Sequence, residues 1–352
     1  MRRNRVFSVC LVALWACGGD STAPNNNNGP TGGTSDPCQI MANPGSANAS
    51  FSATGLFTVS PLTLSAISSI APLGNLNPPI HVYPTDHMFI IPTSAAAGAN
   101  QVFAAAPGTV LELYQPGGGS DWKVMIKADK SFYYYYDHIT PAAGLAVGSA
   151  VTAGQVVGTN SGQAGAVDFG VYNFNNTPLP GILNACLLVG EAYVDSPLKY
   201  FSGATQTSLY AKVNVTGAAT KDGKIDYDQA GKLVGNWVLT GHKPVEDTKY
   251  SLSFVYNVLN HAMRVSAGVL AGGGGSFGVQ QGAPDWATIT PTSGQVNYRL
   301  FPTTGGDSSQ PGSEFGVLAV QMLSATQIKV EVFPGNLTGA ATFTANALIY
   351  DR

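Results

Sequence analysis

The sequence predicts an all-β protein, with an antiparallel β-sandwich or barrel domain followed by a second β-rich domain. Short runs of β-branched and aromatic residues recur along the chain, and turns that contain Gly or Pro separate them. Clear helical periodicity is scarce. Charged residues are only 11% of the chain, while glycine occurs 42 times. This composition is typical of secreted β-proteins.

The chain begins with a predicted targeting segment. The arginines within residues 2–5 form a basic start, and the apolar run of residues 6–15 is too short to span a bilayer. The run ends at Leu14–Gly19, which resembles a bacterial lipobox, where the cysteine carries the lipid. We therefore expect a lipoprotein signal peptide over residues 1–16 and lipidation of Cys17. The alternative is an ordinary signal peptide that contains a cysteine.

Residues 17–47 are expected to form a disordered tether. The segment consists mostly of Asn, Gly, Ser, Thr and Pro, so it cannot bury enough apolar area to offset the entropy of an ordered chain. A lipid anchor followed by a tether holds a globular domain off a membrane surface. The expected location is the bacterial cell envelope, attached to the membrane through the lipid and facing the periplasm or the outside.

Two cysteines remain after the leader and the lipidated residue, and we expect them to pair. In an oxidising envelope, Cys38 and Cys186 favour a disulfide over two free thiols. The bond would tie the start of the first domain to its end. Neither cysteine belongs to a Cys-x-x-Cys motif, which argues against a zinc site made of cysteines.

The first globular domain is expected over residues 48–205. Apart from two short helices expected at residues 60–70 and 189–200, its pattern is one of strands and turns. The tyrosine run Tyr133–Tyr136 places two rings on each face of its strand, because side chains alternate along a strand. The strands expected in this domain are residues 101–104, 109–114, 122–127, 131–136, 150–151, 156–158 and 167–174.

The second domain is expected over residues 206–352, as a β-sandwich or closed barrel of about nine strands. The tripeptide Gly235–Trp237 is similar to the start of some barrels, although three residues are a weak signal. Residues 222–228 lack the order of a calcium-binding loop and favour a solvated turn. The expected strands are residues 210–215, 235–239, 249–256, 264–269, 277–280, 295–301, 316–322, 327–333 and 341–350.

The charge pattern and the missing motifs narrow the function. The net charge is -3 and no basic stripe occurs, so no nucleic-acid partner is expected. The sequence contains no His-Glu-x-x-His, so that familiar zinc-protease signature is absent from the sequence.

Histidine and aspartate gather in three clusters of the first domain, which holds three of the five histidines. The clusters are His81–His87, which includes Asp86, then Tyr136–His138, and Val167–Gly170, which includes Asp168. Imidazole and carboxylate are the ligands and proton carriers of zinc hydrolases. Because short strands separate the clusters, we expect one sheet to bring them together.

The residues around these clusters resemble the LytM-like M23 peptidases, the β-fold zinc endopeptidases of bacterial cell walls. The resemblance covers about residues 80–175. In that family an aromatic run ends in Tyr-x-His, a Gly-rich hairpin follows, and the last strand carries His-x-His-Phe. The matching segments are Val102–Ala104, Pro107–Val110, Tyr135–Ile139, Gly148, Val151–Gly158, Gly162 and Asp168–Val171.

The departures from the family pattern fall on the metal ligands. The family binds zinc through His-x-x-x-Asp and the second His of His-x-His. In this chain the first motif becomes the segment from His81 to His87, and Ala166 and Asp168 stand where the two histidines of the last strand are expected. Only His138 matches the family without change. The resemblance implies His138 as the catalytic imidazole.

Two interpretations of the site remain open. In the first, His87, Asp168 and either His81 or Asp86 hold zinc, water takes the fourth position, and His138 transfers protons or stabilises an oxyanion. In the second, the catalytic centre has decayed, and aspartate and histidine bond to one another in place of a metal.

The leading functional prediction is an atypical M23-like zinc metallopeptidase that acts on cell-wall or extracellular peptides. One alternative is a catalytically inactive M23-like module that binds peptidoglycan or a partner protein. Another is a surface adhesin or carbohydrate-binding lipoprotein, in which both β-domains serve as scaffolds. Zinc content is the property that separates the first prediction from the other two.

Overall fold

The structure is a computed structural model of the chain. It describes residues 45–115, 119–184, 187, 190–244, 248–270, 273–303, 314–335 and 341–352. The expected signal peptide, Cys17, most of the tether and both cysteines of the expected disulfide, Cys38 and Cys186, lie outside the described residues. No helix within these described ranges is long and apolar enough to cross a membrane.

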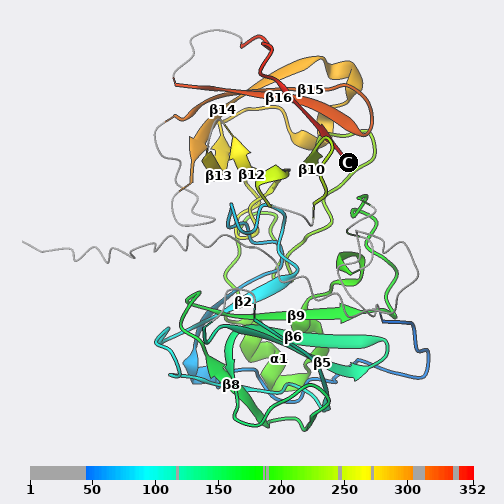
Figure 1. The fold of residues 1–352 in the computed structure, drawn as a ribbon, viewed down its shortest axis with the longest axis vertical. Coiled ribbons are helices and arrows are strands. Elements are labelled where there is room, and N and C mark those ends of the chain that lie inside the picture. Colours follow the sequence, from blue (N-terminus) through cyan, green and yellow to red (C-terminus); the bar gives the residue numbers. More distant parts are fainter. Residues whose placement is uncertain are drawn as a thin grey trace, which may run out of the picture.

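The fold is mostly β, as the sequence predicts, and consists of an antiparallel sheet followed by a closed barrel (Figure 1). The sheet has the strand order β1-β2-β9-β6-β5-β4-β7, while β3 pairs with β8 and β8 pairs with β6. Its strands are β1 (Ile67–Ala71), β2 (His87–Pro92), β3 (Gln101–Phe103), β4 (Gly108–Tyr114), β5 (Trp122–Asp129), β6 (Phe132–Pro141), β7 (Ala150–Val151), β8 (Val156–Asn160) and β9 (Val167–Asn173).

The central strands β2, β9 and β6 have two unlike faces. Every second residue of these strands points to one face, where apolar and aromatic side chains are buried in the hydrophobic core. On the other face, cross-strand partners form two rows, His87–Gly170–Tyr135 and Phe89–Asp168–Asp137. The buried face includes Met88, Ile90, Phe132, Tyr134, Tyr136, Val167, Phe169 and Val171. Polar residues therefore share one side of the sheet because of strand register.

The eight barrel strands follow one another in chain order and close on themselves. Their inward side chains, among them Trp237, Phe254, Tyr298 and Leu318, form a packed core. The strands are β10 (Gly235–Leu239), β11 (Ser251–Tyr256), β12 (Met263–Leu270), β13 (Gly273–Val279), β14 (Gln295–Pro302), β15 (Gly316–Met322), β16 (Gln327–Pro334) and β17 (Leu348–Asp351).

One buried cation joins the two ends of the barrel chain. The guanidinium of Arg352 lies 4.0 Å from the ring centroid of Trp237 on the first strand. It also donates hydrogen bonds to backbone carbonyls, including Val234 O at 2.6 Å. Asp228, whose side chain is fully buried, supplies the counter-charge at 3.7 Å. The Gly235–Trp237 tripeptide does open the barrel, and Arg352 is the partner that the tripeptide alone could not reveal.

Some expected elements are wrong. The helix expected at residues 60–70 is a 3-10 turn, η1 (Leu64–Ala66), followed by strand β1, because β2 supplies the backbone partners of this β-branched segment. The helix expected at residues 189–200 is two 3-10 turns, η2 (Glu191–Tyr193) and η3 (Pro197–Tyr200).

The second half also differs from expectation in three places. The only α-helix of the described ranges is α1 (Gly203–Tyr210), and residues 210–215 contain no strand but a single bridge at Val213. Within residues 341–350, only the last three residues belong to a strand, β17. The barrel consequently has eight strands rather than nine.

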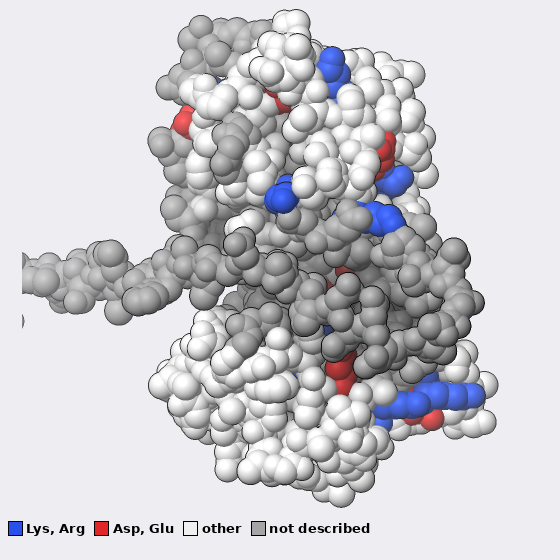
Figure 2. Space-filling model, in the orientation of Figure 1, with Lys and Arg blue, Asp and Glu red and all other residues white. Residues whose placement is uncertain are grey.

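Charged side chains are few and scattered on the face of the molecule shown in Figure 2. The picture agrees with the low charge content of the sequence, at 11% of residues. No dense basic patch marks the described part of this face.

Replacing Arg352 by Ala is expected to lower the free energy of unfolding by about 3–5 kcal/mol, because Asp228 is then left buried without its counter-charge. Urea unfolding followed by tryptophan fluorescence measures the loss. Arg299→Ala is the matched control, because the Arg299–Glu314 pair has a half-exposed arginine and should contribute much less to stability than the buried pair. Equal losses in both variants would contradict the structural role given to Arg352.

Candidate functional site

Strands β2, β9 and β6 bring His87, Asp168 and His138 into direct contact. The Nε2 atom of His87 lies 3.1 Å from Oδ2 of Asp168, and the Nε2 atom of His138 lies 3.4 Å from the same oxygen. Asp168 is only 1% exposed. One buried carboxylate thus stands between two imidazoles that come from the neighbouring strands.

A local backbone distortion places His138 on this face. Strand alternation puts Tyr135 and Asp137 on the polar face, so residue 138 of a regular strand would point into the core. His138 instead has φ of 60°, in the left-handed region, where non-glycine residues are uncommon. The pairing of β5 with β6 also shifts register here, between Trp122 and Val124. This bulge redirects the imidazole toward Asp168.

Each imidazole is held at its other nitrogen by a second carboxylate. Nδ1 of His87 lies 2.8 Å from Oδ1 of Asp86, and Nδ1 of His138 lies 2.9 Å from Oδ2 of Asp121. Tyr172 donates a hydrogen bond to Asp86. The five groups therefore form a chain, Asp86–His87–Asp168–His138–Asp121.

Asp121, Ser161 and Tyr172 belong to the site, and the sequence clusters did not include them. The hydroxyl of Ser161 donates a hydrogen bond to Oδ1 of Asp121 at 2.6 Å. Tyr172 could have been found, because it lies two residues from Gly170 on the polar side of β9. Asp121 follows a glycine-rich segment, and no local pattern points to its contact with His138.

The carboxylates favour the charged form of both central imidazoles. Burial opposes protonation of His87, but the charge of Asp168 and the hydrogen bond to Asp86 raise its pKa to about 10. Burial likewise opposes protonation of His138, but the hydrogen bond to Asp121 and the charge of Asp168 raise its pKa to about 9. Although burial opposes its ionisation, the pKa of Asp168 is lowered by the two imidazoles. Without a metal, the chain of groups is an ion-paired network at pH 7.

His81 lies beside this network in a different state. Its ring centroid is 5.4 Å from that of His87. Burial, followed by the nearby charge of His87, lowers the pKa of His81 to about 4, so the imidazole is neutral at pH 7. The remaining predicted ligand, Asp86, is turned toward Nδ1 of His87. The structure therefore places His81 next to His87, and Asp86 on the Nδ1 side of the His87 imidazole.

Two buried atoms of the site have no hydrogen-bond partner. They are Nε2 of His87 and Oδ1 of Asp168. Nε2 of His87 makes an ion pair with the other carboxylate oxygen, Oδ2 of Asp168, at 3.1 Å. Buried polar atoms are normally satisfied by protein, water or an ion. Two imidazoles and a carboxylate form a donor set that suits zinc, and Asp86 holds His87 as carboxylates hold zinc-bound histidines. Among the residues that the structure describes, no three His, Cys, Asp or Glu side chains stand in metal-binding geometry.

Gly170 leaves space for the ring of Tyr135, which lies next to the site. A Cβ atom on Gly170 would lie 2.2 Å from the ring of Tyr135, so this close approach requires glycine. The hydroxyl of Tyr135 reaches Nδ1 of His87 at 3.2 Å, and the ammonium of Lys123 lies 3.7 Å from the Tyr135 ring centroid. Tyr135 therefore covers one side of the His87–Asp86 pair.

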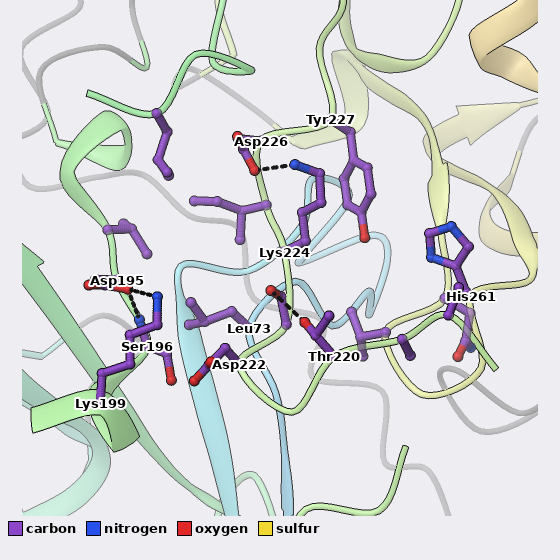
Figure 3. Close-up of a pocket in the computed structure, with 18 residues that line it drawn as sticks. Leu73, Asp195, Ser196, Lys199, Thr220, Asp222, Lys224, Asp226, Tyr227 and His261 are labelled. Atoms are coloured by element: carbon purple, nitrogen blue, oxygen red, sulfur yellow. Dashed lines mark hydrogen bonds and ion pairs between the residues drawn. The ribbon is translucent and has the colours of Figure 1, made fainter. Parts of the chain in front are cut away.

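A cavity of about 310 Å³ lies elsewhere, where the sheet, the segment of residues 218–227 and the barrel hairpin with His261 meet (Figure 3). Four of its charged side chains form two ion pairs, Lys199 with Asp195 at 2.7 Å and Lys224 with Asp226. The chemistry of the histidine–aspartate network is not in this cavity.

Comparison with known protein families gives one match. Residues 91–177 match the model of Peptidase family M23. The matched range contains Asp121, His138 and Asp168 of the network, and it begins after His81 and His87. The M23 match thus agrees with the resemblance that the sequence shows. It does not include the first histidine cluster, residues 81–87.

Several solved structures match this chain, with low TM-scores. Helicobacter pylori Csd3 is 26% identical over 35% of this chain and 33% of its own, with a TM-score of 0.27. A zinc containing peptidase from Vibrio cholerae is 16% identical over 35% of this chain and 37% of its own, with a TM-score of 0.27. Lysostaphin from Staphylococcus simulans is 12% identical over 85% of this chain and 100% of its own, with a TM-score of 0.32. This chain therefore spans about a third of the Csd3 chain, and no curated protein matches it.

The network predicts how stability depends on pH in the metal-free protein. The pKa values of His87 and His138 are raised above the unfolded value of 6.5, to about 10 and about 9. Their contribution is therefore complete below pH 6.5 and is lost as the pH rises through 9 to 10. In a chelator, urea unfolding at pH 7, 8, 9 and 10 should give a steadily falling free energy.

Asp121→Asn tests whether the Asp121 carboxylate raises the pKa of His138. The substitution removes the carboxylate that binds His138, so the pKa of His138 should fall and the alkaline loss of stability should begin at lower pH. NMR titration of the imidazole protons reads the same pKa directly. Asp222→Asn is the control, because Asp222 binds the hydroxyl of Tyr210 away from the network. An unchanged His138 titration in Asp121→Asn would show that the hydrogen bond does not set the pKa.

Proposed function

We propose that the chain is an atypical M23-type zinc metallopeptidase that cleaves peptides of the cell wall or of the extracellular space. The observation that carries this proposal is the presence of two buried atoms without hydrogen-bond partners, Nε2 of His87 and Oδ1 of Asp168, on residues that form an ion pair. The ring of His81 lies beside that of His87. The family match over residues 91–177 supports the reaction class.

His81, His87 and Asp168 would hold the zinc. The M23 pattern uses two imidazoles and one carboxylate, and this set has the same composition. The positions are exchanged, because an imidazole stands on β2 where the family has its aspartate, and a carboxylate stands on β9 where the family has a histidine. An exchange of this kind keeps the net charge of the ligands unchanged.

Bound zinc would polarise the scissile carbonyl and lower the pKa of a coordinated water. The protein groups around it have separate tasks. Asp86 accepts the Nδ1 proton of His87 and leaves Nε2 to face the centre of the site. Asp121 holds His138 in the same way, so that Nε2 of His138 points toward Asp168 and can hold or transfer a proton there. Since Ala166 replaces the other histidine of the family pattern, His138 is the imidazole left for this task.

The second candidate function is a module that binds peptidoglycan or a partner protein without catalysis. The observation in its favour is the ionic balance of the network, in which Asp168 lies between two imidazoles with raised pKa values. Such a network satisfies most of its own charges without a metal. Zinc content separates the two candidates.

The purified chain is expected to retain about one equivalent of zinc through dialysis, because two nitrogens and one carboxylate are a sufficient protein ligand set for a catalytic zinc. The double variant His87→Ala, Asp168→Ala should lose it. Elemental analysis measures the metal, and the double variant His242→Ala, Asp226→Ala controls for removal of the same residue types elsewhere. A zinc-free, folded wild-type protein that still binds sacculi would favour the non-catalytic module.

His138→Ala is expected to keep its zinc and to lose activity by about 10²- to 10⁴-fold, because this imidazole handles the proton rather than the metal. Release of peptide fragments from purified sacculi measures turnover. The control is His261→Ala in the barrel hairpin. If His138→Ala lost zinc as completely as the ligand variant does, His138 would have to be counted as a ligand.

A further inference from the structure

The segment that brings His81 and Asp86 to the site is also packed into the barrel. We call residues 72–86, between β1 and β2, the site loop. Leu76 of the site loop is fully buried and belongs to the barrel core together with Trp237. The hydroxyl of Tyr83 donates a hydrogen bond to the backbone carbonyl of Trp237 at 3.0 Å. The site loop is therefore anchored at two points in the second half of the chain.

Residues 223 and 224, which precede the first barrel strand, contact the backbone at the start of the site loop. Leu73 and Gly223 form a parallel bridge, and the amide of Lys224 donates to the carbonyl of Leu73 at 3.3 Å. A Cβ atom on Gly74 would lie 2.1 Å from the carbonyl oxygen of Lys224, so the two backbones are in close contact. Figure 3 shows Leu73 beside the segment that carries Asp222 and Lys224.

Hydrogen bonds inside the site loop connect these anchors to His81. The amide of Gly74 donates to Thr85 O at 2.9 Å, and the amides of Asn77 and His81 each donate to the other's carbonyl, at 3.0 and 2.9 Å. The loop is thus a closed hairpin rather than a free segment. A shift of Leu76 or Tyr83 would move His81, which is on the same hairpin.

The barrel surface that receives Tyr83 is itself rigid. Trp237 is 1% exposed, its indole donates to Leu233 O at 2.8 Å, and the guanidinium of Arg352 stacks on its ring. The accepting carbonyl is therefore fixed by the same contacts that close the barrel.

We propose that the barrel is a built-in support of the zinc site, and that Leu76 and Tyr83 are positioning residues that hold His81 and Asp86 against His87. The inference rests on the proposed function, because it assigns a role to these residues in binding the metal. In this proposal, the barrel holds the site loop in place through its direct contacts with Leu76 and Tyr83.

The test compares two phenol groups in the full-length protein. Tyr83→Phe removes the hydrogen bond between the site loop and Trp237, while Tyr298→Phe removes an equivalent bond inside the barrel, from the Tyr298 hydroxyl to Pro284 O at 3.1 Å. Both should lower stability to a similar degree. Only Tyr83→Phe should raise the zinc Kd, by about fivefold, while Tyr298→Phe should stay within about twofold of the wild type. Competition with a chromophoric chelator, at a temperature where all variants are folded, measures Kd.

A second pair of variants covers the apolar anchor. Leu76→Ala should weaken zinc binding in the same direction, and Leu318→Ala, at an equally buried leucine of the barrel core, should lower stability without this effect. Equal zinc affinity in Leu76→Ala and Leu318→Ala would count against the anchor.

A metal-free measurement keeps this inference separate from the proposed function. The nuclear Overhauser effect between the imidazole protons of His81 and His87, whose ring centroids are 5.4 Å apart, should weaken in Tyr83→Phe and persist in Tyr298→Phe. If the wild type binds no zinc but this effect changes as expected, the zinc function fails and the supporting role stands. If Tyr83→Phe keeps both the zinc affinity and the Overhauser effect, the supporting role is overturned.

Discussion

The buried carboxylate of Asp168 is the constraint on which the rest of the site depends. A charge that is 1% exposed on the central strand of a sheet is costly unless cations and hydrogen bonds surround it. His87 and His138 meet this need from the two neighbouring strands. Each imidazole then requires an acceptor at its other nitrogen, and Asp86 and Asp121 provide it. One buried charge thus accounts for the alternation of aspartate and histidine through the whole network.

Local features of the backbone also shape the surroundings of this network. His138 adopts a left-handed conformation because a regular strand would turn its ring into the apolar core. Gly170 has no side chain because the ring of Tyr135 lies over it. The hairpin of the site loop is packed against the barrel, so the position of His81 depends on residues as distant in sequence as Trp237. The sheet and the barrel are therefore coupled through the site.

Much of this arrangement follows from patterns in the sequence, and the rest depends on contacts that a sequence pattern does not encode. Strand alternation and turn residues predict the mostly β fold and place Asp168 and Tyr172 on one face. The role of Asp121 depends on a loop that returns to a bulged strand, so neither spacing nor alternation reveals it. The helix expected at residues 60–70 failed because its apolar spacing is compatible with an edge strand, and the pairing with β2 decides between them.

In the ligand set that we propose, an imidazole and a carboxylate would have exchanged places across two paired strands, relative to the M23 pattern. Phe89 faces Asp168 and His87 faces Gly170 in the register of β2 and β9, so the two exchanged groups sit diagonally on the same face. Diagonal neighbours on a sheet are within reach of each other's side chains. The proposed exchange would therefore keep the ligand types of the M23 pattern while altering its sequence signature.

X-ray absorption at the zinc edge of the loaded protein identifies the atoms that bind the metal. The ligand set His81, His87 and Asp168 predicts a shell of nitrogen and oxygen atoms at about 2.0–2.2 Å, with the outer-shell scattering of two imidazoles and no sulfur. A sulfur shell at about 2.3 Å, or scattering from fewer than two imidazoles, would contradict the account.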